Sequence, residues 1–176
     1  MSSCRVQVNI PAVGFSLNSI SNQQKMNELE FDFLVQAFPT KEMQRLSPNE
    51  TPWHIQASDT LQGIMNGKMD LFFEQSGKYY ILDWKSNHLG NQTADYGATQ
   101  VSEAMTANNY HLQYHLYTIA LCLYLRWRLP DFDYDRDFGG VIYLFVRGVR
   151  AGEDTGIFYH KPSRSLINEM LQLFGC

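Results

Sequence analysis

The spacing of polar and apolar positions predicts several strands in the chain. Residues 28–33 (ELEFDF) alternate between the two kinds, as a half-buried strand does. Two further strand-like runs, 67–74 (GKMDLFFE) and 78–85 (KYYILDWK), are joined by a segment containing Ser76-Gly77, which is typical of a tight hairpin turn. Residues 140–147 (GVIYLFVR) are almost continuously apolar, which favours a buried central strand.

Helical spacing dominates two other segments. Residues 99–128 carry a long helical pattern that ends before a proline. A final helix is expected over 163–174, where Pro162 or Ser163 suits the first position. Between these two helices, and after the buried strand, residues 156–159 are expected to form a short strand.

Two stretches lack either periodicity. Residues 1–27, which are rich in Ser, Asn and Gln, are expected to be a loosely structured leader, and residues 39–52, with three prolines, a loop. The remaining order of strand pair, helix, buried strand and helix predicts an α/β fold. We therefore expect a single domain over residues 28–176.

The composition supports a globular domain and limits its setting. Hydrophobic residues make up 44% and aromatic residues 14% of the 176 positions, enough for a real core. The longest apolar runs are shorter than the roughly 20 residues of a membrane-spanning helix, so no membrane association is expected. Cys4, Cys122 and Cys176 are odd in number and widely spaced, which favours a reducing compartment, the cytoplasm. Cys122 is expected to be buried and inert.

The net charge changes this picture only slightly. A formal charge of −4 and a sequence pI of about 5.7 argue mildly against a free-standing nonspecific nucleic-acid binder. They do not exclude a nuclease, because acids clustered at a metal site lower the net charge.

The predicted hairpin brings two acids together. With Ser76-Gly77 as a two-residue turn, Gln75 faces Lys78 and Asp70 faces Asp83, with Cβ atoms roughly 4.5–5.5 Å apart. Like charges in that position repel, whereas a divalent cation between them makes the arrangement favourable. Carboxylate oxygens are the ligands that Mg²⁺ prefers.

Lys85 adds a cation to the same face. It lies two residues beyond Asp83, so strand alternation points both side chains to one side, while the backbone carbonyl of Trp84 between them could be a further metal ligand. Carboxylates, a metal and an adjacent ammonium can hydrolyse a phosphodiester. The alternative is that Asp70 is a solvated strand-end residue and that the DxK triplet arose by chance.

Three ordered motifs resemble the PD-(D/E)xK nuclease superfamily, RecB branch. They are GKMD (67–70), ILDWK (81–85) and QYHLY (113–117), which correspond to GxxD, hhDxK and QxxxY. The runs DWKSNHLG, YHLQYHLYTIAL and FGGVIYLFVRGV are also similar to the C-terminal nuclease domain of RecB-type proteins, the beta subunit of exodeoxyribonuclease V. The likeness covers roughly residue 63 to residue 176.

This resemblance implies a fold, a site and a setting. The fold would be a restriction-endonuclease-like core, a mixed central sheet whose hairpin carries the acids, flanked by helices. Asp70, Asp83 and the Trp84 carbonyl would hold Mg²⁺, Lys85 would be the catalytic lysine, and Gln113 and Tyr117 would contact DNA or brace the metal ligands. The chain would cleave DNA, as single strands delivered by a helicase, during double-strand-break repair alongside RecC-like and RecD-like subunits.

Two departures from the family pattern stand out. A metal-binding histidine on an upstream helix is expected in the family, but the only histidine before Asp70 is His54, in a proline-flanked loop. An incomplete metal site is therefore one expectation, with Glu28 or Glu30 as the candidate to complete it. The chain also lacks GxxxxGK[ST], so it looks like a piece of a longer helicase–nuclease subunit.

The other histidines and two rival functions complete the interpretation. His111 and His115 are four residues apart, but lie on nearly the opposite helical face from Gln113 and Tyr117, so a solvated or interface role is expected. His88 is expected to be an ordinary loop histidine. The alternatives to a DNA nuclease are a catalytically idle docking module of the same fold and a nuclease acting on RNA.

Overall fold

The strands form one mixed sheet of five and one small sheet of two. The computed structural model describes residues 8–56 and 59–176, and in it the larger sheet has the order β3-β4-β5-β6-β7. Only β5 and β6 are parallel neighbours; the other adjacent strands are antiparallel. The strands are β1 Asn9–Ile10, β2 Phe15–Ser16, β3 Lys25–Phe38, β4 Leu61–Gln75, β5 Lys78–Lys85, β6 Phe138–Phe145 and β7 Ile157–His160.

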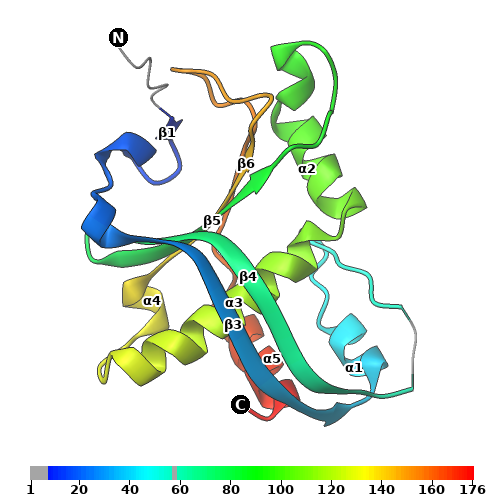
Figure 1. The fold of residues 1–176 in the computed structure, drawn as a ribbon. Coiled ribbons are helices and arrows are strands. Elements are labelled where there is room, and N and C mark those ends of the chain that lie inside the picture. Colours follow the sequence, from blue (N-terminus) through cyan, green and yellow to red (C-terminus); the bar gives the residue numbers. More distant parts are fainter. Residues whose placement is uncertain (1–7, 57–58) are drawn as a thin grey trace.

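The helices lie mainly on one side of this sheet. In Figure 1, α3 crosses behind the long curved ribbon of β3 and β4, with α5 beside it. The helices are α1 Thr40–Arg45, α2 Ala98–Ala107, α3 Tyr110–Arg128, α4 Tyr134–Asp137 and α5 Arg164–Phe174, with 3₁₀ turns at Leu17–Ser19, Asn22–Gln24 and Thr93–Tyr96. This is the mixed sheet flanked by helices that a restriction-endonuclease-like core requires.

Alternation along the strands builds a core on each face of the sheet. Ile81 and Val141 point toward α3 and α5 and join the larger apolar cluster, whereas Leu82 and Ile142 point to the opposite face. Each central strand is therefore apolar on both sides. Residue 141–145 side chains are all fully buried, which explains the continuous apolar run predicted there.

The hairpin between β4 and β5 matches its prediction. Ser76 and Gly77 both have positive φ, at 53° and 75°, as a primed two-residue turn requires. The pairing begins with Gln75 opposite Lys78 and continues to Leu71 opposite Leu82. The predicted register is therefore confirmed up to the residues next to the two aspartates.

The segment expected as a loose leader is structured where it is described. Residues 8–24 contain β1, β2 and two 3₁₀ turns, and β3 already begins at Lys25. Ile10 and Ile20 are buried against the sheet face opposite α3, in the cluster that contains Leu82. The few apolar residues in this polar segment cover that face, which the composition alone did not reveal; residues 1–7 lie outside the described part.

Two other expected boundaries were wrong. The helix predicted over 99–128 is divided into α2 and α3, because Asn109 adopts a left-handed conformation with φ of 55°. Its side-chain amide exchanges two hydrogen bonds with the backbone of His54, at 3.0 and 2.8 Å, which stabilise the break. The loop predicted over 39–52 contains α1, since Pro39 is tolerated at a helix start.

Other elements agree with the expectations within a few residues. Ser163 is the N-cap of α5, where its side chain accepts a hydrogen bond from the Leu166 amide. Cys122 is buried, and burial raises the pKa of its thiol to about 12, consistent with an inert role. In the part of the chain that the structure describes, no helix is both long enough and apolar enough to cross a membrane.

Candidate active site

Asp83 and Lys85 lie on the sheet face that α3 covers, and Asp70 lies beside them at the end of the β4–β5 ladder. Asp83 and Lys85 alternate with Leu82 and Trp84 along β5, and so point to the same side as Ile81 in the larger core cluster. Asp70 precedes Leu71 on β4, and its charge acts on Asp83 and on Tyr117. Asp83 is only 4% exposed and the Lys85 side chain 11% exposed, whereas Asp70 is half-buried.

The two aspartates meet where the β4–β5 ladder stops. They are the next residues outward from the last pair, Leu71 and Leu82. The Asp70 carboxylate accepts a hydrogen bond from the Trp84 backbone amide at 2.9 Å, so a side chain takes the place of strand pairing here. This contact ties Asp70 to the strand that carries Asp83 and Lys85.

The Asp83 carboxylate sits in an unfavourable environment for its charge. Burial raises the pKa of Asp83, the charge of Asp70 raises it further, and the neighbouring Lys85 lowers it. Lys85 Nζ lies 2.6 Å from Asp83 Oδ1, yet that oxygen has no partner of hydrogen-bond geometry among the described residues. The distance establishes an ion pair between Lys85 and Asp83 inside the protein.

Gln113 joins the lysine to α3. Its side-chain oxygen accepts hydrogen bonds from Lys85 Nζ and from the Tyr143 hydroxyl, both at 2.9 Å. Its amide nitrogen donates to the Tyr117 hydroxyl at 3.0 Å. Burial, followed by the charges of Asp83 and Asp70, raises the pKa of Tyr117 to about 12, so its hydroxyl stays protonated. Gln113 and Tyr117, the pair predicted on α3, therefore belong to one hydrogen-bonded cluster with Lys85.

Two tyrosines that the sequence analysis missed complete this cluster. Lys85 Nζ lies 4.0 Å from the ring centroid of Tyr110 and 5.0 Å from that of Tyr143, close enough for cation–π attraction. Tyr143 is the direct partner of Asp83 in the parallel β5–β6 ladder. The sequence offered one indication that Tyr143 belongs to a polar site. Its hydroxyl group lies within an otherwise apolar strand, and a buried hydroxyl needs a polar partner.

The side chain of Trp84 takes no part in this cluster. It is 46% exposed and points away from the face that carries the acids. Its backbone does take part, because its amide binds Asp70. The carbonyl of the same residue lies between the two site residues of β5, as the sequence predicts.

Sequence comparison with known proteins identifies the family of this chain. No family model matches the chain. Relatives described as "RecBCD enzyme subunit RecB" are 38% identical in Haemophilus influenzae and 37% identical in Escherichia coli, over 92% and 97% of this chain. The chain is homologous to the C-terminal domain of RecB. A relative of the same description from Mycobacterium tuberculosis is 41% identical over 61% of the chain.

The match covers a small part of each RecB relative. The chain spans 14% of the length of the Haemophilus influenzae protein and 15% of the Escherichia coli protein. The activities and partners of a whole RecB subunit involve much more of the protein than this domain.

The donor set is smaller than the one expected for RecB-type nucleases. Within residues 8–56 and 59–176, no group of three or more His, Cys, Asp or Glu side chains is placed to hold a metal. Glu30 is exposed on β3, whose neighbouring residues Leu29 and Phe31 pack toward α3, so Glu30 points to the other face. Glu28 is also exposed and pairs with Lys68 at 2.9 Å. Neither glutamate joins the two aspartates.

The solvated or interface role expected for His111 and His115 was wrong. Both are buried, at 1% and 0% exposed, where they pack with Tyr114 and Phe158 or Trp53. Burial lowers the pKa of His111 to about 4 and that of His115 to about 3. They face away from Gln113, as predicted, but toward the core beneath α3. His54 and His88 are exposed.

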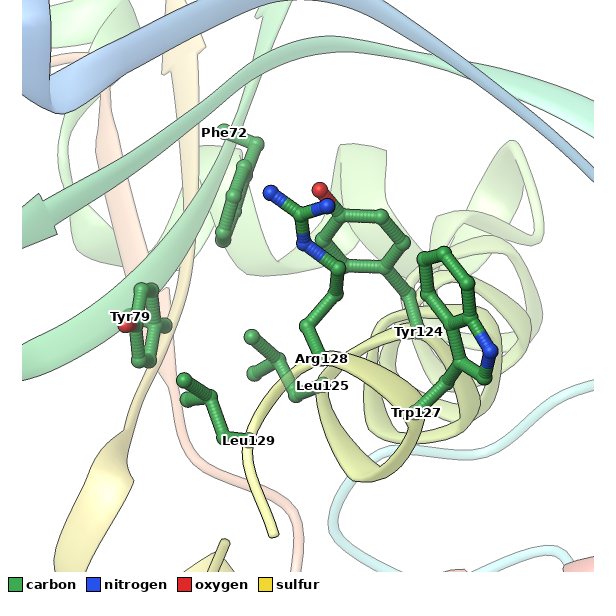
Figure 2. Close-up of a pocket in the computed structure, with 7 residues that line it drawn as sticks. All are labelled: Phe72, Tyr79, Tyr124, Leu125, Trp127, Arg128 and Leu129. Carbon is green, nitrogen blue, oxygen red and sulfur yellow. The ribbon is translucent and has the colours of Figure 1, made fainter.

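A pocket near the C-terminal end of α3 is separate from this cluster. It has a volume of about 480 Å³ and contains none of the predicted site residues. Figure 2 shows Arg128 extended beside Tyr124, with Trp127 on the outer side. The guanidinium carbon lies 6.0 Å from the Tyr124 ring centroid and 5.8 Å from that of Trp127. The predicted site residues of α3, Gln113 and Tyr117, lie nearer the N-terminal end of the helix.

Proposed function

We propose that this chain hydrolyses DNA phosphodiester bonds with Mg²⁺, as the nuclease domain of a RecBCD-type repair enzyme. One observation carries the proposal: Asp70 accepts a hydrogen bond from the Trp84 backbone amide, between Asp83 and Lys85, and the lysine is held by Gln113. Two neighbouring carboxylates and a half-enclosed ammonium have little value for stability alone, because burial opposes each charge. They suit the binding of a cation and a phosphate.

The residues present fit a hard divalent cation. The Asp83 carboxylate is buried with Lys85 as its ion-pair partner, and the charge of Asp70 raises its pKa further. Mg²⁺ is commonly held by one or two carboxylates and keeps several waters, so two aspartates with the Trp84 carbonyl form a sufficient set. When bound, Mg²⁺ would polarise the phosphoryl oxygen and lower the pKa of a coordinated water.

The chain's own groups would supply position and charge. Lys85 orients the attacking water and stabilises the negative charge that develops on the phosphoryl oxygens. The water oxygen forms a bond to phosphorus and loses one proton to solvent, and the bond from phosphorus to the sugar oxygen breaks as that oxygen takes up a proton from solvent. Gln113 keeps the lysine in place by accepting its hydrogen bond, and a second bond from Tyr143 orients the same amide oxygen, so the ammonium is already positioned before substrate arrives.

The setting of the reaction follows from the relatives. These relatives are described as subunits of the RecBCD enzyme. We propose that this domain works beside RecC-like and RecD-like subunits in the cytoplasm, on single strands of DNA that a helicase delivers. The acidic net charge of −4 agrees with a domain whose DNA channel is completed by other parts of an assembly.

Cleavage assays test the catalytic assignment. The wild-type chain is incubated with end-labelled single-stranded DNA and Mg²⁺ or EDTA, next to Asp83→Ala and Lys85→Ala. Asp32→Ala on β3 is the matched control, because Asp32 is an exposed strand aspartate outside the cluster. We expect metal-dependent cleavage by the wild type and the control only. Equal cleavage by all four proteins would end the assignment.

Calorimetry tests the rival idea of an idle docking module. Such a module needs no metal, whereas the proposed nuclease binds Ca²⁺ or Mg²⁺ through Asp70 and Asp83. We expect heat of binding with the wild-type chain and none with Asp70→Asn. Binding that survives Asp70→Asn would place the cation elsewhere.

A further inference from the structure

A groove between the β3–β4 ribbon and the first half of α3 opens beside the candidate active site. Its volume is about 400 Å³. Phe31 and Met65 contribute to it from the ribbon, and Leu112 and Leu116 contribute from the helix. We call this the α3 groove. The phosphodiester chemistry described above makes no use of it.

The α3 groove is continuous with the cluster that holds Lys85. Gln113, Tyr110 and Tyr117 all line it. Gln113 binds Lys85 Nζ at 2.9 Å, and the Tyr110 ring centroid lies 4.0 Å from the same atom. Whatever occupies the groove therefore lies next to the group that would contact the scissile phosphate.

The lining of the groove favours a flat, uncharged occupant. None of the described residues that line it carries a charge, so it offers nothing to a phosphate. Its walls are aromatic and aliphatic, and the side-chain amide of Asn66 is among its polar lining groups. Aromatic and apolar walls with a few amides are the chemistry that binds nucleobases, by stacking and edge contacts.

Gly67 shapes one wall of this groove. A Cβ atom added at Gly67 would lie 2.5 Å from Cζ of the Phe31 ring, too close for any real contact. The absence of a side chain lets this ring lie directly over β4, where its edge contacts Tyr117 at a centroid distance of 5.7 Å. The ring that would stack on a base is therefore positioned from two sides.

We propose that the α3 groove binds one base of the DNA strand adjacent to the scissile phosphate. This rests on the proposed nuclease function. The base enters between the ribbon and the helix, and its phosphate neighbour is thereby placed at Lys85. Such a contact fixes the register of the strand without reading its sequence, because every base has a face that can stack.

Oligonucleotides with a single abasic position test the proposal. The abasic site is moved stepwise along a labelled single strand, and kcat/KM of the 176-residue chain is measured with Mg²⁺. At one position near the cleaved bond we expect a loss of about tenfold, the usual size of a lost base–aromatic contact. In Phe31→Ala and Leu112→Ala that extra loss disappears, because the contact is already absent.

Two matched controls separate the groove from general damage. Phe33→Ala removes a ring that stacks on Phe31 at 6.1 Å but lies outside the groove, and Leu123→Ala removes a half-buried leucine from the other half of α3. Both should keep the tenfold abasic loss. The proposal is overturned if no abasic position affects the wild type, or if Phe31→Ala and Leu112→Ala keep the full loss.

A binding measurement distinguishes this proposal from the nuclease assignment. A strand carrying one 2-aminopurine, whose fluorescence falls on stacking, is titrated with the chain in Ca²⁺. We expect quenching by the wild type and Phe33→Ala, and none by Phe31→Ala. Quenching without any Mg²⁺-dependent cleavage would end the nuclease function and keep the base site. Absence of quenching by the wild type would end the base site, with the groove then free to be covered by protein.

Discussion

Gln113 on α3 accepts a hydrogen bond from Lys85 at the end of β5, 2.9 Å away and 28 residues earlier in the chain. The same oxygen accepts the Tyr143 hydroxyl from β6, so three elements meet at a single acceptor. An amide oxygen suits this role because it attracts the ammonium without neutralising it. The lysine keeps its charge for a phosphate while losing its conformational freedom.

Removal of this acceptor should slow cleavage and leave metal binding intact. Gln113→Met preserves the size of the side chain and loses its bonds to Lys85, Tyr143 and Tyr117. We expect kcat to fall by about 10- to 100-fold, as for other groups that orient a ligand or catalytic residue. The Ca²⁺ affinity measured by calorimetry should change little, since the Gln113 side chain bonds to Lys85, Tyr143 and Tyr117 and to neither aspartate.

The control for this variant is Gln172→Met, at an exposed position on α5. It should retain wild-type kcat. A Gln113→Met protein with unchanged kcat would show that the lysine needs no positioning, and a large loss of Ca²⁺ affinity would assign Gln113 to the metal shell.

A divalent cation should stabilise the folded chain. Asp83 is buried beside a second carboxylate, and both burial and the charge of Asp70 raise its pKa, so a bound cation removes an unfavourable interaction. A ligand that binds only the folded state adds about 2.7 kcal/mol when its free concentration is 100 times Kd. Thermal unfolding with and without Ca²⁺ measures this, and Asp70→Asn should abolish the shift. An equal shift in Asp70→Asn would refute cation binding between the two acids.

Asn109 should matter for stability through the break between α2 and α3. Asn109→Ala loses both hydrogen bonds to the His54 backbone and forces alanine into a left-handed conformation. We expect a loss of about 2–3 kcal/mol from these two effects. Asn109→Gly keeps the conformation accessible and should lose only about 1–2 kcal/mol. Denaturant unfolding measures both, and equal losses would mean that backbone strain contributes nothing.

The hairpin and the two acids were predictable because they depend on local rules. A glycine-containing turn sets the register, and strand alternation sets the face, so Asp83 and Lys85 had to point together. The break at Asn109 was not predictable, because its partner is the backbone of His54, far away in the sequence. A helical pattern continues across such a break without a change in its periodicity.

Tyr143 and the buried histidines show the same limit. The place of Tyr143 depends on the parallel register of β5 and β6, which no turn between them defines. His111 and His115 were correctly separated from Gln113 around the helix, but their burial comes from Trp53 and β7 packing on that second face. When a helix is covered by apolar residues on two faces, the sequence around a histidine does not show whether that histidine is buried or exposed.

The buried histidines predict that stability falls in mild acid. Burial lowers the pKa of His111 to about 4 and of His115 to about 3, from an ordinary value of 6.5, and burial also lowers that of His160 nearby. A group whose pKa is lower in the folded state favours unfolding when it is protonated. The full stability is therefore present above pH 6.5 and declines as the pH falls toward 4, by up to about 1.4 kcal/mol per pH unit for each histidine. Urea unfolding at pH 7.5 and pH 5 should show the decline, His111→Gln should reduce it, and the exposed-site control His88→Gln should not. A decline that is the same in His111→Gln as in the wild type would assign the acid sensitivity to other groups.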